Sequence, residues 1–149
     1  MTKPTDSTIL FLCTGNYYRS RFAEILFNAS AAQSALTWRA TSRGLAVERG
    51  AHNVGPMAKS AIAMLETMGL GNTADCARFP VQATAHDFET SARVIALKQA
   101  EHLPLSQERF PTWAQKVEFW HIDDAPGVLG LIEREVVELI EHLHGLHAP

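Results

Sequence analysis

Residues 8–20 read Thr-Ile-Leu-Phe-Leu-Cys-Thr-Gly-Asn-Tyr-Tyr-Arg-Ser, and this stretch decides the fold. Its first part, 8–13, is a continuous apolar run before a glycine-containing turn, which is typical of a strand buried on both faces. From Ser20, a candidate N-cap, apolar residues recur at helical spacing (Phe22, Ile25, Leu26, Ala29). The order strand, turn, helix predicts the first β-α unit of a parallel sheet.

The same alternation continues along the chain. Further strands are expected at 36–41, 93–97 and 117–122. Helices are expected from Pro56 to Gly69 and from about Val128 onward, and residues 71–88 are expected to form loops with short helical pieces. The repeated order of strand and helix predicts an α/β fold with a doubly wound parallel sheet. Because ligands of such sheets bind beyond the carboxyl ends of the strands, the turn after the first strand lies at the functional edge.

Length and composition limit the classes of protein to consider. The chain has 149 residues, 46% hydrophobic and 19% charged, which predicts a single packed domain over residues 1–149. The net charge is -3 without a basic tract, which argues against a nucleic-acid partner. Apolar runs are too short for a membrane partner, and the polar residues 1–8 lack the apolar stretch of a signal peptide. The two cysteines, too few for a disulfide scaffold, favour a cytoplasmic location.

The turn at 13–20 has the chemistry of a phosphate site. Successive backbone N–H groups in a tight loop converge on an anion, and the following helix adds its positive end. The expected phosphate-binding residues are therefore the loop residues Thr14, Gly15, Asn16, Tyr17, Tyr18 and Arg19. Gly15 and Asn16 tolerate the backbone angles that such a loop needs. Arg19 can fork two hydrogen bonds onto phosphoryl oxygens.

The same electrostatic field acts on Cys13. Inward-pointing amides and a nearby guanidinium favour a thiolate, which is the nucleophilic form of cysteine. Ser20 can donate a hydrogen bond to that thiolate and so help it to leave in a second step. A buried cysteine that only closes a strand is the alternative interpretation, and the glycine, asparagine and arginine of the loop argue against it.

A second candidate feature follows the last expected strand, at Asp123 and Asp124. Cleavage of a phosphate ester through a cysteine needs an acid that protonates the departing oxygen. The parallel-sheet prediction brings these carboxylates to the same edge as Cys13. A helix N-cap or a turn is the alternative role for them.

At these residues the chain resembles the low-molecular-weight protein tyrosine phosphatases and the related thioredoxin-coupled arsenate reductases. The resemblance rests on Cys-x5-Arg-Ser at 13–20, Ser-Arg-Gly at 42–44 and Trp-x-Ile-Asp-Asp at 120–124. It implies a four-stranded parallel sheet with helices on both faces, and no metal or organic cofactor. It also implies that Cys13 is the nucleophile, Arg19 the phosphate clamp and Asp124 the general acid. Ser20 then stabilises the thiolate, and Asn16 helps to hold the loop.

The sequence also departs from that family. Tyr18 stands where family phosphatases often have a second cysteine, and Cys76 is far away in sequence. Ala125 replaces the usual proline after the acid, and the aromatic residues that commonly line the substrate cleft are missing. Tyr17 and Tyr18 either supply a wall of the cleft or pack against the core. Asp75 stands where some members have a histidine that supports the loop. Arg43 either attracts an anionic substrate or forms a surface ion pair.

Three functions are compatible with these features. The foremost is a hydrolase of phosphomonoesters, chiefly phosphotyrosine, that works through a phosphocysteine. The partner would be a phosphorylated protein or a small phosphomonoester, and phosphate or another oxyanion would occupy the loop; phosphoarginine also stays open. The second is a phosphate- or phosphopeptide-binding module with little turnover. The third is arsenate reduction, which needs resolving thiols where this chain has Lys98 and no cysteine pair.

Overall fold

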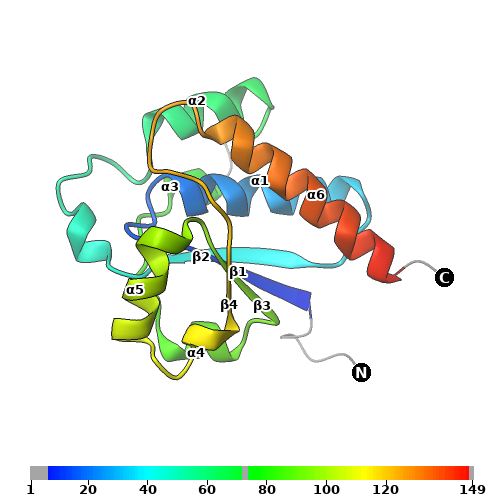
Figure 1. The fold of residues 1–149 in the computed structure, drawn as a ribbon. Helices are drawn as coiled ribbons and strands as arrows, with labels where there is room; N and C mark the ends of the chain where they lie inside the picture. Colours follow the sequence, from blue (N-terminus) through cyan, green and yellow to red (C-terminus); the bar gives the residue numbers. More distant parts are fainter. Residues whose placement is uncertain (1–6, 72–73, 148–149) are drawn as a thin grey trace.

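The computed structural model describes residues 7–71 and 74–147, and a four-stranded parallel sheet lies at its centre (Figure 1). The strands are β1 (Thr8–Cys13), β2 (Arg39–Gly44), β3 (Arg93–Ala96) and β4 (Val117–Phe119). Their order across the sheet is β2-β1-β3-β4, and every neighbouring pair is parallel. The predicted α/β fold with a four-stranded parallel sheet is confirmed.

Strand β1 is central and is buried on both faces, as its apolar run predicts. Successive side chains of a strand point to opposite faces. Ile9 and Phe11 accordingly enter one hydrophobic cluster, and Leu10 and Leu12 enter the other. All four are fully buried, so the two halves of the core meet at this strand.

Helices cover both faces of the sheet (Figure 1). The cluster around Phe11 contains side chains of α1, α2 and α6, and the cluster around Leu10 contains side chains of α4 and α5. The helix bounds are α1 Arg19–Gln33, α2 Lys59–Thr67, α3 Ala74–Ala77, α4 Ala85–Glu89, α5 Gln99–Arg109 and α6 Leu129–His147. The short 3-10 helices η2 (Val47–Gly50) and η3 (Ala114–Lys116) lie between these elements. The repeated order of strand and helix predicted a helix between β3 and β4 without giving its bounds, and this helix is α5.

Strand β2 lies three residues later than the apolar pattern predicts. Leu36 and Trp38 belong to the core, but they lie in the connection after α1, where Leu36 N donates to the carbonyl oxygen of Ala31 (2.8 Å). The strand itself pairs with β1 from Thr8↔Arg39 to Cys13↔Gly44. Pairing with the central strand, rather than the apolar run, therefore sets its bounds.

The start of α2 and the end of β4 also differ from the sequence-based prediction. Helix α2 begins at Lys59 rather than at Pro56, because Ala58 N is engaged by the carbonyl oxygen of Tyr17 (2.9 Å). Strand β4 ends at Phe119 rather than at 122, although Ile122 N still bonds to the carbonyl oxygen of Leu97 (2.8 Å). The predicted start of α6 and the short helical pieces within 71–88 are confirmed.

The parallel arrangement brings the segments that follow β1, β3 and β4 to one edge of the sheet. Within the described residues, no helix has both the length and the apolar character needed to cross a membrane. The expectation that the N-terminus is not a signal peptide concerns mainly residues 1–6, which lie outside the described residues.

Candidate active site

The loop after β1 is held by backbone hydrogen bonds to the segment that follows β2. Leu45 N donates to the carbonyl oxygen of Cys13, and Ala46 N to that of Thr14 (both 2.9 Å). Gly44 allows this close approach, because a Cβ at that position would lie 2.8 Å from the carbonyl oxygen of Thr14. Asn16 has a φ of 52°, a left-handed conformation that asparagine tolerates better than most residues. The loop therefore has the tight form that the sequence predicts.

A buried polar network connects the candidate nucleophile to the loop. Cys13 Sγ lies 3.0 Å from Ser20 Oγ. Asn16 Nδ2 donates to Ser20 Oγ (2.8 Å) and to Ser42 Oγ (3.0 Å). Because Ser20 accepts from Asn16, its own hydroxyl hydrogen is available for the sulfur. The structure thus places Cys13, Asn16 and Ser20 together, as their expected roles require.

Arg78 supports Asn16 from the other side. Its Nη1 donates to Asn16 Oδ1 (3.2 Å), and its Nη2 contacts both Glu24 Oε1 (3.0 Å) and Ser42 Oγ (3.1 Å). Among the described residues, Asp75 makes no side-chain hydrogen bond to Asn16, and its carbonyl oxygen accepts from Arg21 Nη2. Arg78 therefore supports the loop in this chain, a role that the sequence did not indicate.

Arg21 is a fully buried arginine behind the loop. Its guanidinium donates to the carbonyl oxygens of four residues in three segments: Asn16, Pro56, Asp75 and Arg78. Burial, followed by the nearby Arg78 charge, lowers the pKa of Arg21 to about 10, so it still carries its charge at neutral pH. Arg21 thus fastens the loop to the segments before α2 and around α3.

Arg19 is buried at the start of α1 and is held by groups from two other segments. Its Nη1 donates to the carbonyl oxygen of Ile122 (2.9 Å), and its Nη2 donates to Glu101 Oε2 (2.8 Å). A guanidinium has five N–H groups, so donors remain for a phosphoryl group. The arrangement fixes the orientation of the expected phosphate clamp.

Glu101, in the first turn of α5, was missed by the sequence analysis. Its Oε2 accepts from Arg19 and also from the hydroxyl of Thr14. His102 Nδ1 accepts from Lys98 N (3.0 Å), and its Nε2 lies 3.1 Å from Glu101 Oε2. His102, Arg19 and Thr14 hold the pKa of Glu101 well below its usual range, although partial burial opposes them. A signal existed, because Glu101 follows β3 at the functional edge.

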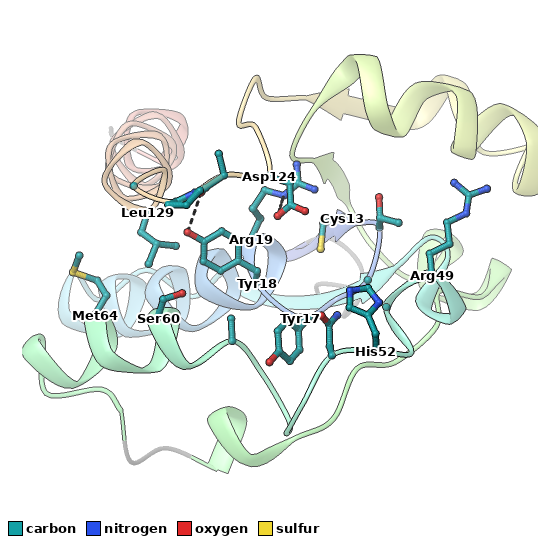
Figure 2. A pocket seen from close by; sticks show the side chains of 18 of the residues that line it. Cys13, Tyr17, Tyr18, Arg19, Arg49, His52, Ser60, Met64, Asp124 and Leu129 are labelled. Atoms are coloured by element: carbon teal, nitrogen blue, oxygen red, sulfur yellow. Dashed lines mark hydrogen bonds and ion pairs between the residues drawn. The ribbon is translucent and has the colours of Figure 1, made fainter.

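The structure separates the two aspartates after β4. Asp124 lines the same cleft as Cys13, and its Oδ1 lies 3.8 Å from Arg19 Nε (Figure 2). Asp123 forms an ion pair with Lys98 instead (2.8 Å) and does not line the cleft. Two-thirds of the Asp124 side chain is exposed, so water reaches it. Of the two, only Asp124 lies in the cleft with Cys13 and Arg19.

The segment after Asp124 is attached to the loop by Tyr18. Tyr18 Oη donates to the carbonyl oxygen of Ala125 (3.2 Å). Burial, with a further effect of the Asp124 charge, raises the pKa of this phenol, so it is a neutral donor at physiological pH. Tyr17 Oη makes a comparable bond to the carbonyl oxygen of Val54. Both tyrosines line the cleft and also pack against the core, so both interpretations of these residues hold.

The cleft above Cys13 has a volume of about 700 Å³. Of the expected phosphate-binding residues, Thr14, Gly15, Tyr17, Tyr18 and Arg19 line it, whereas Asn16 lies buried beneath it with Ser20. Arg43 does not line it and pairs with Asp87 (3.4 Å), which supports the surface ion pair. Among residues 7–71 and 74–147, no group of three or more His, Cys, Asp and Glu side chains could hold a metal ion.

A cysteine, a guanidinium and a carboxylate around one cleft, at the carboxyl edge of a parallel sheet, fit the class of cysteine-based phosphatases. A model of the family "Low molecular weight phosphotyrosine protein phosphatase" matches residues 8–144, and the chain belongs to this family. Family and fold support a phosphatase function. A search of curated proteins found no significant match.

Three solved structures show the same fold. YfkJ from Bacillus subtilis is 20% identical, with a TM-score of 0.78 over 95% of this chain and 96% of that one. Vibrio vulnificus Wzb in complex with benzylphosphonate is 16% identical (TM-score 0.76, 91% and 97%). A mutant of the arginine phosphatase YwlE with a phosphorylated active-site serine is 22% identical (TM-score 0.68, 93% and 92%); YwlE is also from Bacillus subtilis.

Proposed function

We propose that the protein hydrolyses phosphomonoesters, with phosphotyrosine as the foremost substrate, through a phosphocysteine formed on Cys13. One observation carries the proposal: Cys13 Sγ, 3.0 Å from the Ser20 hydroxyl, shares one cleft with Arg19 and Asp124 (Figure 2). This geometry supplies a nucleophile, a clamp for the phosphoryl oxygens and an acid for the leaving group. Membership in the phosphatase family supports the same reaction.

In the first step the Cys13 thiolate attacks phosphorus, and the bond from phosphorus to the ester oxygen breaks. Asp124 gives its proton to that oxygen, so the alcohol or phenol leaves neutral. The free N–H groups of Arg19 and the loop amides bind the three remaining oxygens, where charge is concentrated in the transition state. Glu101 keeps Arg19 oriented for this contact.

In the second step the Asp124 carboxylate accepts a proton from a water molecule, which attacks phosphorus and breaks the S–P bond. Ser20 donates its hydrogen bond to the departing thiolate of Cys13. Inorganic phosphate leaves, and Asp124 is again protonated for the next cycle. The proposed mechanism uses no metal or organic cofactor.

The substrate proposal is a phosphorylated protein or a small phosphomonoester. The Vibrio Wzb structure holds benzylphosphonate and YwlE is named an arginine phosphatase, so an aromatic phosphate ester and a phosphorylated guanidinium are both candidate substrates for this fold. Tyr17 and Tyr18 on the cleft wall favour the aryl group here, because aromatic rings stack on one another. A cytoplasmic location is part of the proposal and rests on the cysteine usage.

The test is hydrolysis of p-nitrophenyl phosphate between pH 5 and 8. We expect Cys13→Ser to abolish turnover and Asp124→Asn to lower kcat by about 100-fold or more, because the second step needs Asp124 as the base for water whatever the leaving group. Asp123→Asn is the matched control, because it removes a neighbouring exposed carboxylate outside the cleft. Turnover that survives Cys13→Ser would exclude the phosphocysteine.

The same assay decides between the alternatives. An inactive wild type that still binds vanadate would favour the phosphate-binding module. Arsenate reduction requires a second thiol to resolve an adduct on Cys13. Cys76 is buried in α3 and does not line the cleft, which argues against that reaction.

A further inference from the structure

The cleft continues beyond the loop and the acid into an apolar region between α2 and α6. We define this region as the apolar subsite, and its lining residues are Tyr18, Ser60, Met64, Leu129 and Gly130. None of them is charged. In Figure 2, Met64, Ser60 and Leu129 lie on one side of Tyr18, whereas Cys13, Arg49 and His52 lie on the other. Cations and apolar groups are thus separated within a single cleft.

Short side chains create this space. The segment that follows Asp124 is Ala-Pro-Gly, and α6 has Gly130 in its first turn. A Cβ added to Gly130 would have no atom within 4 Å, so the space beside it is open. On the opposite wall, Ser60 and Met64 are four residues apart and therefore lie on one face of α2. Met64 is 38% exposed, so part of its side chain is accessible to a ligand in the cleft.

The subsite belongs to the cavity of the proposed catalytic groups. Asp124 protonates the ester oxygen, so whatever is attached to that oxygen starts at Asp124. Ala125, Pro126 and Leu129 follow Asp124 along the chain and line the same cleft. Its volume of about 700 Å³ is in the range that holds drug-sized ligands, which is more than a phosphate with a single ring needs.

We propose that the apolar subsite binds the leaving group of the substrate, and that this group is an aryl or alkyl moiety larger than a single ring. The proposal rests on the proposed phosphatase function and specifies its substrate class. Burial of a second ring against Tyr18, Met64 and Leu129 is expected to raise kcat/KM about tenfold. The gain is no larger because the site is open on one side, so the ring is only partly buried. A phosphopeptide that places a neighbouring apolar side chain there is the competing occupant.

The test compares biphenyl-4-yl phosphate with phenyl phosphate, two aryl esters that differ chiefly in size. We expect the wild type to prefer the biphenyl ester about tenfold in kcat/KM. In Gly130→Leu the new side chain fills the open space, and the variant hydrolyses the two esters with about equal kcat/KM. Gly145→Leu is the matched control, because it makes the same exchange on the same helix, also in open space, without lining the cleft. It keeps the preference.

Each outcome decides a different point. If the wild type hydrolyses neither ester, the proposed function fails, and the subsite proposal fails with it. If it hydrolyses both equally well, or if Gly130→Leu keeps the preference, the phosphatase function stands and the subsite proposal is overturned. A further comparison uses phosphotyrosine peptides with leucine or serine beside the phosphorylated residue. Suppose the wild type prefers the leucine peptide, Gly130→Leu loses this preference, and neither enzyme prefers the biphenyl ester. The subsite then binds a peptide side chain, and the proposal for the leaving group is overturned.

Discussion

At the scale of single residues, Arg21 shows how one side chain joins several segments. It satisfies backbone carbonyls of the loop, of the segment before α2 and of the region around α3. Without it, buried carbonyl oxygens lose their donors, and such groups cost free energy when they stay unpaired. Arg21 is therefore a structural support of the phosphate loop rather than a ligand of the phosphate.

Replacement of Arg21 tests this role. We expect Arg21→Met to lower the free energy of unfolding by about 3 kcal/mol, because the apolar chain fills the volume but donates no hydrogen bond. Arg93→Met is the control, since Arg93 belongs to a partly exposed ion pair with Glu118 and should cost less than about 1 kcal/mol. Urea unfolding of both variants measures the difference. Equal losses in the two would contradict a special role for Arg21.

At the scale of elements, Tyr18 links the start of α1 to the segment after β4. The Tyr18 hydroxyl donates to the carbonyl oxygen of Ala125, next to the proposed general acid. This hydrogen bond restrains the backbone of the segment that follows Asp124. The position of Asp124 therefore depends on a residue in the phosphate loop.

The link predicts a change in how the rate depends on the leaving group. In Tyr18→Phe the ring stays but the restraint on the acid segment is lost. We expect kcat/KM, which reports the first step, to fall by about fivefold to tenfold for phenyl phosphate, whose leaving group needs a proton. Hydrolysis of p-nitrophenyl phosphate, whose leaving group departs readily as an anion, should fall far less. Tyr17→Phe removes a hydroxyl that bonds elsewhere, to Val54, and should leave the ratio of the two rates unaltered. A Tyr18→Phe enzyme that slows both substrates equally would show a general structural role instead.

Elements also show what the sequence can predict. The strand at 8–13 and the loop after it were predictable, because an apolar run and a Cys-x5-Arg-Ser spacing are local features. The position of β2 was not, since its register comes from pairing with β1 rather than from its own apolar residues. Arg78 was missed for the same reason, and Glu101 was missed although its place after the third strand was a partial signal. Both act on the loop across more than 60 residues of chain, a contact that only the fold creates.

At the scale of the whole molecule, Glu101 makes stability depend on pH. The depressed pKa of this carboxyl, due first to His102 and then to Arg19 and Thr14, means that the folded state binds its proton less readily than the unfolded chain. The stabilisation is therefore complete above the unfolded pKa of about 4.3 and disappears as pH falls below it. Because a third of the Glu101 side chain is exposed, solvent screening limits the effect to about 1 kcal/mol.

This dependence can be measured by urea unfolding of the wild type and Glu101→Gln between pH 7 and pH 3. We expect a difference of about 1 kcal/mol in the free energy of unfolding at pH 7, which shrinks toward zero as the pH falls below about 4. Glu118→Gln breaks the ion pair with Arg93 far from the cleft, and its cost should stay below about 0.5 kcal/mol. A Glu101→Gln difference that is the same at every pH would mean that Glu101 stabilises the fold by packing alone. A difference that fades with acid would show that its charge joins α5 to the phosphate loop.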